Sequence, residues 1–142
     1  MLPSRRAYAS EVPTTFTRII DGEIPATFVH RDDRCVAFMS INPLARGHVL
    51  VVPIDEIDHW IDASPELVGH LFDVAHRIGK AQQQAFHCAR VGVIVAGYEV
   101  PHAHIHVIPT EHMGQLAFEN AAESVDGDEL EAAATAIRTL LI

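Results

Sequence analysis

Three histidines alternate with small or apolar residues in the segment Pro101-His-Ala-His-Ile-His-Val-Ile-Pro109. Successive side chains of a β-strand point to opposite faces, so His102, His104 and His106 are predicted to share one face of a strand. The residues between them then face the core. A second strand with a histidine at its start is predicted at 48–53, where His48 precedes an apolar run that ends in proline. These imidazoles are the residues of the chain best suited to chemistry.

A row of imidazoles on a strand has three interpretations, and the simplest is a solvent-exposed polar face. A metal site is the second, because imidazole is a common ligand of zinc. A strand rises ~3.3 Å per residue, so His102 and His106 start ~13 Å apart. One ion could therefore bind only two neighbouring histidines, such as His104 and His106, with His48, Glu99 or Glu111 as a further ligand.

Nucleophilic catalysis is the third interpretation. Imidazole has an ordinary pKa near 6.5, and clustered imidazoles disfavour each other's protonation, so at least one ring keeps a free lone pair at pH 7. If one ring nitrogen donates to a backbone carbonyl, the other becomes a nucleophile in a fixed tautomer. His104 has a histidine on either side and is the predicted nucleophile. Its neighbours can bind phosphate oxygens or protonate a leaving group.

Composition limits the partners of the chain. The 142 residues carry 19 acidic and 10 basic side chains, a formal net charge of −9 that argues against nucleic-acid binding. A phosphate-bearing ligand must therefore be held by a local site. The two cysteines form no CxxC motif, and we expect a reducing, cytoplasmic setting. No apolar run approaches the ~20 residues of a membrane-spanning helix, so no membrane partner is expected.

The order of predicted elements indicates an α+β fold, an antiparallel sheet with helices on one face. Residues 1–14 are predicted to be a flexible arm and residues 15–142 a single domain. Strands are predicted at 26–30, 35–38, 48–53 and 91–96, in addition to the histidine strand. A short helix is predicted at 16–20, a surface turn or single helical turn at 55–62, a long helix from Ser64 to about Phe86 and a final helix at about 126–141. The stretch at 113–125 is predicted to be irregular.

The histidine segment resembles the His-φ-His-φ-His-φ-φ signature, with φ apolar, of the histidine triad superfamily. The resemblance extends over residues 16–110, because the segments 16–26, 32–38 and 42–53 are similar to that family's first helix and turn, its hairpin and its next strand. The similarity is strongest to the histidine triad nucleotide-binding proteins, which act as nucleoside phosphoramidases. It implies the HIT-like fold, with a sheet of about five strands, one long helix and short flanking helices.

The resemblance also implies roles for individual residues. His104 would attack an α-phosphorus and form a nucleotidyl-histidine intermediate, which water hydrolyses. His102 would orient the site, His106 would contact phosphate, and His48 would complete the site from the next strand. The implied partner is a purine nucleotide or nucleotide conjugate, no metal or other cofactor is implied, and members of the family usually form homodimers. The residues that match the nucleotide-binding positions are Phe16, Ile19, Phe38, Ser40 and Ile41, with Tyr98 as a further candidate.

Two departures from the family pattern bear on the substrate. Ser40 stands where an acidic residue usually binds the ribose hydroxyls. The loop at 95–100 is shorter than usual, with Ala96 and Tyr98 in place of polar residues that position the phosphate. A nucleotide-binding or scaffolding protein with little turnover is therefore the alternative function, and a metal-dependent hydrolase is a third.

Other polar and aromatic residues are predicted to have structural rather than catalytic roles. Arg46 is assigned to a solvated loop, and Trp60 to a packing or dimer contact. The remaining histidines considered are predicted to lie on the surface, and they are His59, His70, His76, His87 and His112.

Overall fold

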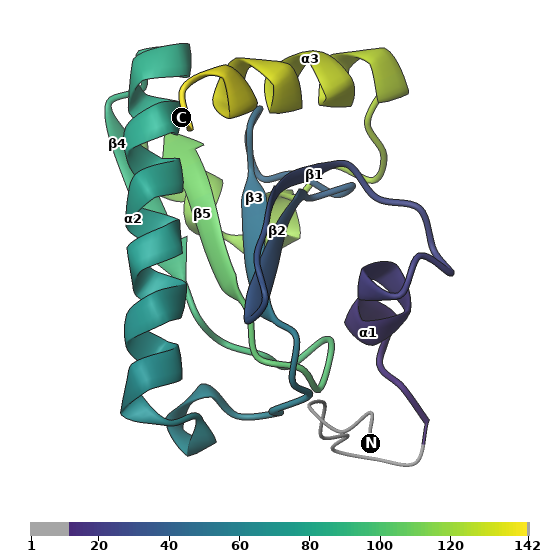
Figure 1. Cartoon of the computed structure of the whole chain (residues 1–142). Helices are drawn as coiled ribbons and strands as arrows, with labels where there is room; N and C mark the ends of the chain where they lie inside the picture. The colour runs from purple at the N-terminus through teal and green to yellow at the C-terminus, as the bar shows by residue number, and fades with distance from the viewer. Residues whose placement is uncertain (1–11, 142) are drawn as a thin grey trace.

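The computed structural model describes residues 12–141, so most of the predicted arm and Ile142 lie outside the described residues. Five antiparallel strands form one sheet in the order β1-β2-β3-β5-β4 (Figure 1). The strands are β1 (Phe28–Arg31), β2 (Cys35–Met39), β3 (Val49–Pro53), β4 (Arg90–Ile94) and β5 (Ile105–Thr110). The α-helices are α1 (Thr15–Ile20), α2 (Pro65–Phe86) and α3 (Gly127–Thr139), and the 3-10 turns are η1 (Trp60–Asp62), η2 (Met113–Leu116) and η3 (Phe118–Asn120). The predicted α+β class is confirmed.

Alternation along the central strands divides the core into two parts. In β2, Cys35, Ala37 and Met39 pack toward α2 and α3, whereas Val36 and Phe38 pack toward α1. The helices therefore lie on both sides of the sheet, with α1 opposite α2 (Figure 1). The prediction that all helices cover one face is wrong, because the short α1 buries its own apolar side against the second face of β2 and β3.

The long helix α2 begins and ends where its sequence predicts. Ser64 caps its N-terminus by accepting a hydrogen bond from the Leu67 N–H (3.1 Å), and Pro65 occupies the first helical position. His87 ends it in the left-handed conformation at φ 53°. The side chain of the buried Gln82 donates to the carbonyls of Gly47 (2.8 Å) and Val107 (2.9 Å), so α2 also fixes the start of β3 against β5. None of the helices in the described residues is long and apolar enough to span a membrane.

The histidine segment is only partly a strand. Regular pairing begins at Ile105, so His102 and His104 precede β5. The prediction that both lie within the strand is wrong. The reason is local hydrogen bonding, since the Ala103 N–H donates to the Ile57 carbonyl (2.6 Å) rather than to a neighbouring strand. The core-facing residues behave as predicted, and Ala103, Ile105 and Val107 are buried.

Candidate functional site

His104 is held in one tautomer by the backbone. Its Nδ1 lies 2.7 Å from the carbonyl oxygen of His102, and a carbonyl can only accept, so Nδ1 carries the proton. The other nitrogen, Nε2, therefore keeps its lone pair. The side chain is buried and packs edge-on against Phe16, with ring centroids 5.0 Å apart. The arrangement creates an oriented, unprotonated imidazole nitrogen.

His48 and His106 are fixed by a chain of hydrogen bonds that starts at the backbone. The Leu44 N–H donates to Nδ1 of His48 (3.0 Å), so the proton of His48 is on Nε2. That Nε2–H lies 2.9 Å from Nδ1 of His106 and donates to it. His106 consequently carries its own proton on Nε2. Two adjacent rings, with centroids 4.8 Å apart, thus present opposite groups: a lone pair on His104 and a donor on His106.

Burial keeps these imidazoles neutral. Removal from water, followed by the charge of His104, lowers the pKa of His48 to about 4. Burial and the neighbouring His104 and His48 lower the pKa of His106 to about 3. Burial also lowers the pKa of His104, although its bond to the His102 carbonyl and the charge of Glu99 act the other way. At neutral pH the cluster therefore holds the tautomers derived from its hydrogen bonds.

His102 supports the site from behind. Its Nε2 lies 2.8 Å from the Pro53 carbonyl and donates to it, and its Nδ1 lies 2.7 Å from the Thr14 hydroxyl and accepts from it. Both ring nitrogens are engaged, and the side chain is fully buried. His102 therefore acts on His104 through its own backbone carbonyl, which is the acceptor for His104 Nδ1.

The N-terminus of α1 is joined to this support. Thr14 is the N-cap of α1, and its hydroxyl accepts from the Thr17 N–H (3.1 Å). The buried carboxylate of Glu56 accepts from the Thr14 N–H (2.8 Å) and from the Thr17 hydroxyl (2.7 Å). Thr14, the last residue of the predicted arm, is thus buried in the domain. This network positions α1, and with it Phe16, against His102 and His104.

A turn formed by Gly47 places His48 at the start of β3. Gly47 has φ 90°, a conformation that residues with a side chain rarely adopt, and a Cβ there would collide with the ring of Phe86. The register of β3 on β5 then pairs Leu50 with His106, on the face of the sheet that α1 covers. The strand pairing explains how residues 58 positions apart come into hydrogen-bonding contact.

A cavity of about 470 Å³ opens beside the histidines. Most of its wall is apolar, and its size suits a nucleotide-sized ligand. Eight of the predicted site residues line it, and they are Phe16, Ile19, Phe38, Ser40, Ile41, His48, His104 and His106. His102 lies behind the cavity, and Tyr98 is 96 % exposed and does not line it. A role for Tyr98 at the site remains a prediction.

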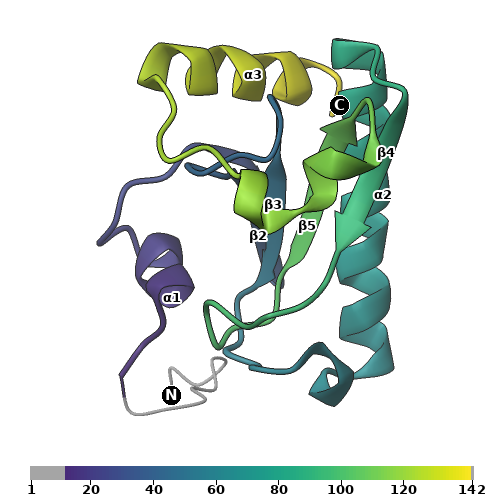
Figure 2. The ribbon, with the colours of Figure 1, turned by 180° about the vertical axis from the view of Figure 1, so that it is seen from behind.

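The segment after β5 forms one wall of the cavity, which was not predicted from the sequence. Figure 2 shows this segment crossing the sheet from β5 to α3. The ring of Phe118 lies 4.9 Å from that of His106, and the Asn42 amide donates to the carbonyls of Ala122 (3.2 Å) and Glu123 (2.9 Å). Weak periodicity at 113–125 concealed this contribution, and the only available signal was a lone aromatic residue in an irregular stretch.

Residues 21–113 match the HIT domain family, a span that contains all four histidines of the site. The chain belongs to the HIT family. An uncharacterized HIT-like protein of Methanocaldococcus jannaschii is 36 % identical over 121 residues, which cover 81 % of this chain and 93 % of that protein. Protein hit of Bacillus subtilis is 31 % identical over 99 residues, covering 66 % of this chain and 68 % of that protein.

Solved structures of HIT proteins have the same fold. A Hit-like protein of Bartonella henselae, described as involved in cell-cycle regulation and crystallised with an unknown ligand, superimposes with a TM-score of 0.81 at 32 % identity. The match covers 96 % of this chain and all of the other. A zinc-bound histidine triad protein of Mycobacterium smegmatis gives a TM-score of 0.75 at 26 % identity, covering 89 % and 91 % of the two chains.

Proposed function

We propose that this HIT protein binds a purine nucleotide or nucleotide conjugate and cleaves a phosphoramidate, or a related bond to the α-phosphate, through a nucleotidyl-histidine intermediate. The observation that carries the proposal is the tautomer of His104. Its Nδ1 donates to the His102 carbonyl, which leaves Nε2 as a buried and oriented lone pair. The adjacent donor of His106 lies where it can bind a phosphate oxygen.

The proposed reaction has two displacement steps. The Nε2 lone pair of His104 forms a bond to the α-phosphorus, the P–N bond breaks, and the departing amine takes the electron pair of that bond and a proton from solvent. Water then attacks the same phosphorus and loses a proton to solvent, the bond between His104 Nε2 and phosphorus breaks, and the nucleoside monophosphate and His104 are released. The donor on His106 Nε2 stabilises the charge that builds up on a phosphate oxygen in both steps.

The cavity supports the nucleotide assignment. Phe16, Phe38 and Ile19 form an apolar wall that a base and ribose can pack against, at a distance from the polar histidines. The Ser40 hydroxyl accepts from the Asn42 N–H (3.2 Å) and lies in the same wall. We propose that Ser40 faces the ribose and that Phe118 closes the side next to the phosphate.

Hydrolysis of adenosine 5′-phosphoramidate tests the proposal. We expect turnover by the wild type and a loss on the order of 10³-fold or more in His104→Ala, because the nucleophile is removed. His59→Ala, at an exposed position, is the matched control and should keep its activity. Nucleotide binding without turnover of any phosphoramidate, anhydride or thiophosphate would contradict the enzymatic proposal and favour a binding module.

We further propose a homodimer formed along β4. This strand is one of the two edge strands of the sheet, and its Val93 is 47 % exposed. An apolar cavity of about 550 Å³ lies between α2 and this edge, with Phe72, Val91 and Val93 in its wall. A second copy would cover this surface by pairing along the open edge. Sedimentation should show a dimer that Val93→Glu converts to a monomer, whereas Ala132→Glu on α3 leaves it intact.

A further inference from the structure

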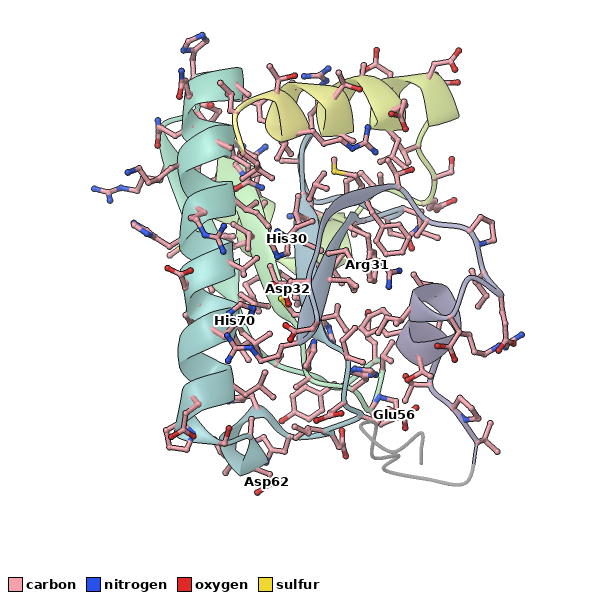
Figure 3. The ribbon with its side chains drawn as sticks, viewed as in Figure 1. His30, Arg31, Asp32, Glu56, Asp62 and His70 are labelled. Carbon is pink, nitrogen blue, oxygen red and sulfur yellow. The ribbon has the colours of Figure 1, made fainter. Side chains whose placement is uncertain are left out.

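A second group of ligand-type side chains lies on the opposite face of the sheet from the catalytic histidines. It consists of His30 on β1, Asp32 in the β1–β2 turn and Cys35 at the start of β2. Their ligand atoms all lie within 4.8 Å of one another. His70 of α2 approaches the same point, as Figure 3 shows for the labelled His30, Asp32 and His70.

The carboxylate of Asp32 is oriented by the backbone. Its Oδ1 accepts from the N–H groups of Arg34 and Cys35, both at 2.8 Å. These two bonds turn the other oxygen, Oδ2, toward the side chains around it. Oδ2 lies 2.7 Å from His30 Nε2, 2.8 Å from His70 Nε2 and 3.6 Å from Cys35 Sγ. A single oxygen is thus the common neighbour of two imidazoles and a thiol.

We propose that His30, Asp32, Cys35 and His70 form a binding site for Zn²⁺ or a related late first-row divalent ion. Imidazole, thiolate and carboxylate are the three side-chain ligand types of zinc, at bond lengths of ~2.0–2.3 Å. Four such ligands around one tetrahedral centre lie ~3.3–3.8 Å from each other. The three contacts to Asp32 Oδ2 are 2.7 to 3.6 Å long, and the ligand atoms of His30, Asp32 and Cys35 lie within 4.8 Å of one another, so small outward movements of the side chains open the space for the ion.

Three of the four ligands come from the β1–β2 hairpin. His30, Asp32 and Cys35 lie within six residues of one another and are held by a turn whose backbone N–H groups are bonded to Asp32. The side chains of His30, Asp32 and His70 are 20 %, 25 % and 15 % exposed, so an ion can reach them from solvent. The buried Cys35 closes the inner side of the site.

Arg34 controls the access of the fourth ligand. Its guanidinium Nη2 lies 3.0 Å from His70 Nδ1 and donates to it, so Nε2 is the ring nitrogen that donates to Asp32. Binding to the ion through Nε2 requires the ring proton to move to Nδ1, so Arg34, which is exposed, must move away. Each imidazole ligand keeps one proton on Nδ1, and the thiol proton of Cys35 is released to solvent when the thiolate binds the ion.

An ion at this position would connect the β1–β2 hairpin to α2. Asp32 and His70 are 38 residues apart in the chain, and their hydrogen bond already joins the two elements. Four bonds to one ion would replace this hydrogen bond, and the folded state would gain stability from the metal. The site lies outside the catalytic cavity and does not depend on the proposed reaction.

Titration of the metal-free full-length protein with Co²⁺ tests the proposal, because a thiolate ligand adds a charge-transfer absorption in the near ultraviolet. We expect one equivalent to bind with this absorption, and Zn²⁺ to displace it. Cys35→Ser should abolish the absorption, whereas Cys88→Ser, at the other buried cysteine, should retain it. His104→Asn should also retain it, which separates the site from the catalytic histidines.

Two further variants cover the case in which Cys35→Ser fails to fold. His30→Gln, at a half-buried position, should weaken Co²⁺ binding at least tenfold. Arg34→Met should strengthen it, because the cation next to the ion and the competing bond to His70 are both removed. Absence of the absorption in the wild type, its loss in Cys88→Ser or His104→Asn, or unchanged affinity in both His30→Gln and Arg34→Met would overturn the proposal.

Discussion

The sheet carries a histidine cluster on each face, and the two differ in their partners. On the α1 face, His48 bonds to His106 and to the Leu44 N–H, and His104 bonds to the His102 carbonyl, with no carboxylate among these hydrogen-bond partners. On the α2 face, His30 and His70 both bond to Asp32. The first cluster lines a cavity of about 470 Å³, and the second joins a hairpin to a helix.

The hydrogen-bond partners of an imidazole decide which chemistry it can perform. Without a carboxylate, burial lowers the pKa of His48 and His106 and leaves neutral rings whose tautomers follow from the backbone. In the second cluster the Asp32 carboxyl carries the charge. Burial opposes its ionisation, but hydrogen bonds from His30, the turn backbone and His70 hold its pKa well below the usual range. Neutral rings suit a nucleophile, and a histidine–carboxylate group suits a cation.

Among variants that keep His104, the largest effect is expected where the hydrogen bond between His48 and His106 is removed. His48→Phe removes the donor to His106 Nδ1, so the His106 ring can adopt the tautomer that points a lone pair at the phosphate. We expect turnover to fall by about 10–100-fold, as for other residues that orient a functional imidazole. The measurement is kcat for phosphoramidate hydrolysis. Unchanged kcat in a folded His48→Phe protein would show that His106 is oriented by other contacts.

Acid unfolding measures how strongly burial lowers the pKa values of the histidines that line the cavity. The folded-state pKa values of His48 and His106 are lowered to about 4 and about 3, whereas the unfolded chain protonates near 6.5. Below pH 6.5 the unfolded state therefore binds more protons, and the free energy of unfolding falls as pH is lowered toward 4, by up to about 3 kcal/mol per histidine.

Urea unfolding at several pH values between 4.5 and 7.5 checks this dependence. In His48→Phe the slope should be flatter by about one proton, because one buried neutral imidazole is gone. Val91→Ala, which removes partly buried methyl groups but no titratable group, should shift all values without changing the slope. Equal slopes in the wild type and His48→Phe would mean that His48 is not held neutral.

The smallest effect separates two helix caps that have the same local role. Thr14→Val and Ser64→Ala each remove an N-cap hydroxyl and should cost about 1 kcal/mol of stability. Only Thr14 also donates to His102, which positions His104. We therefore expect kcat to fall several-fold in Thr14→Val and to stay unchanged in Ser64→Ala. Equal kcat values in the two variants would remove Thr14 from the support of the site.

Much of the fold could be predicted from local signals. The Ser64-Pro65 start of α2, the β-branched run of β3 and the capping residue Asp126 of α3 all act within a few residues, and each element lies where it was predicted. The start of β5 could not be predicted, since it depends on the bond between Ala103 and Ile57. The position of α1 on the second face likewise depends on contacts between distant residues.

The candidate site was likewise predictable only in part from the sequence. Alternation indicated the histidine row, and a strand with His48 next to it was visible in the sequence. The tautomers were not predictable, because they depend on Leu44, His48 and His106 meeting through sheet pairing. The prediction that His70 is a surface residue was wrong, since its side chain is 15 % exposed and bonded to Asp32 from another element.

Trapping the covalent intermediate tests the proposal that His104 Nε2 is the nucleophile. The protein is mixed with adenosine 5′-phosphoramidate, quenched within the first turnovers, digested and analysed by mass spectrometry. We predict an adenylyl group on the peptide that contains residues 101–109, assigned by fragmentation to His104 and absent in His104→Ala. An adduct on His102 or His106, or turnover that persists in His104→Ala, would contradict the assignment of His104 as the nucleophile.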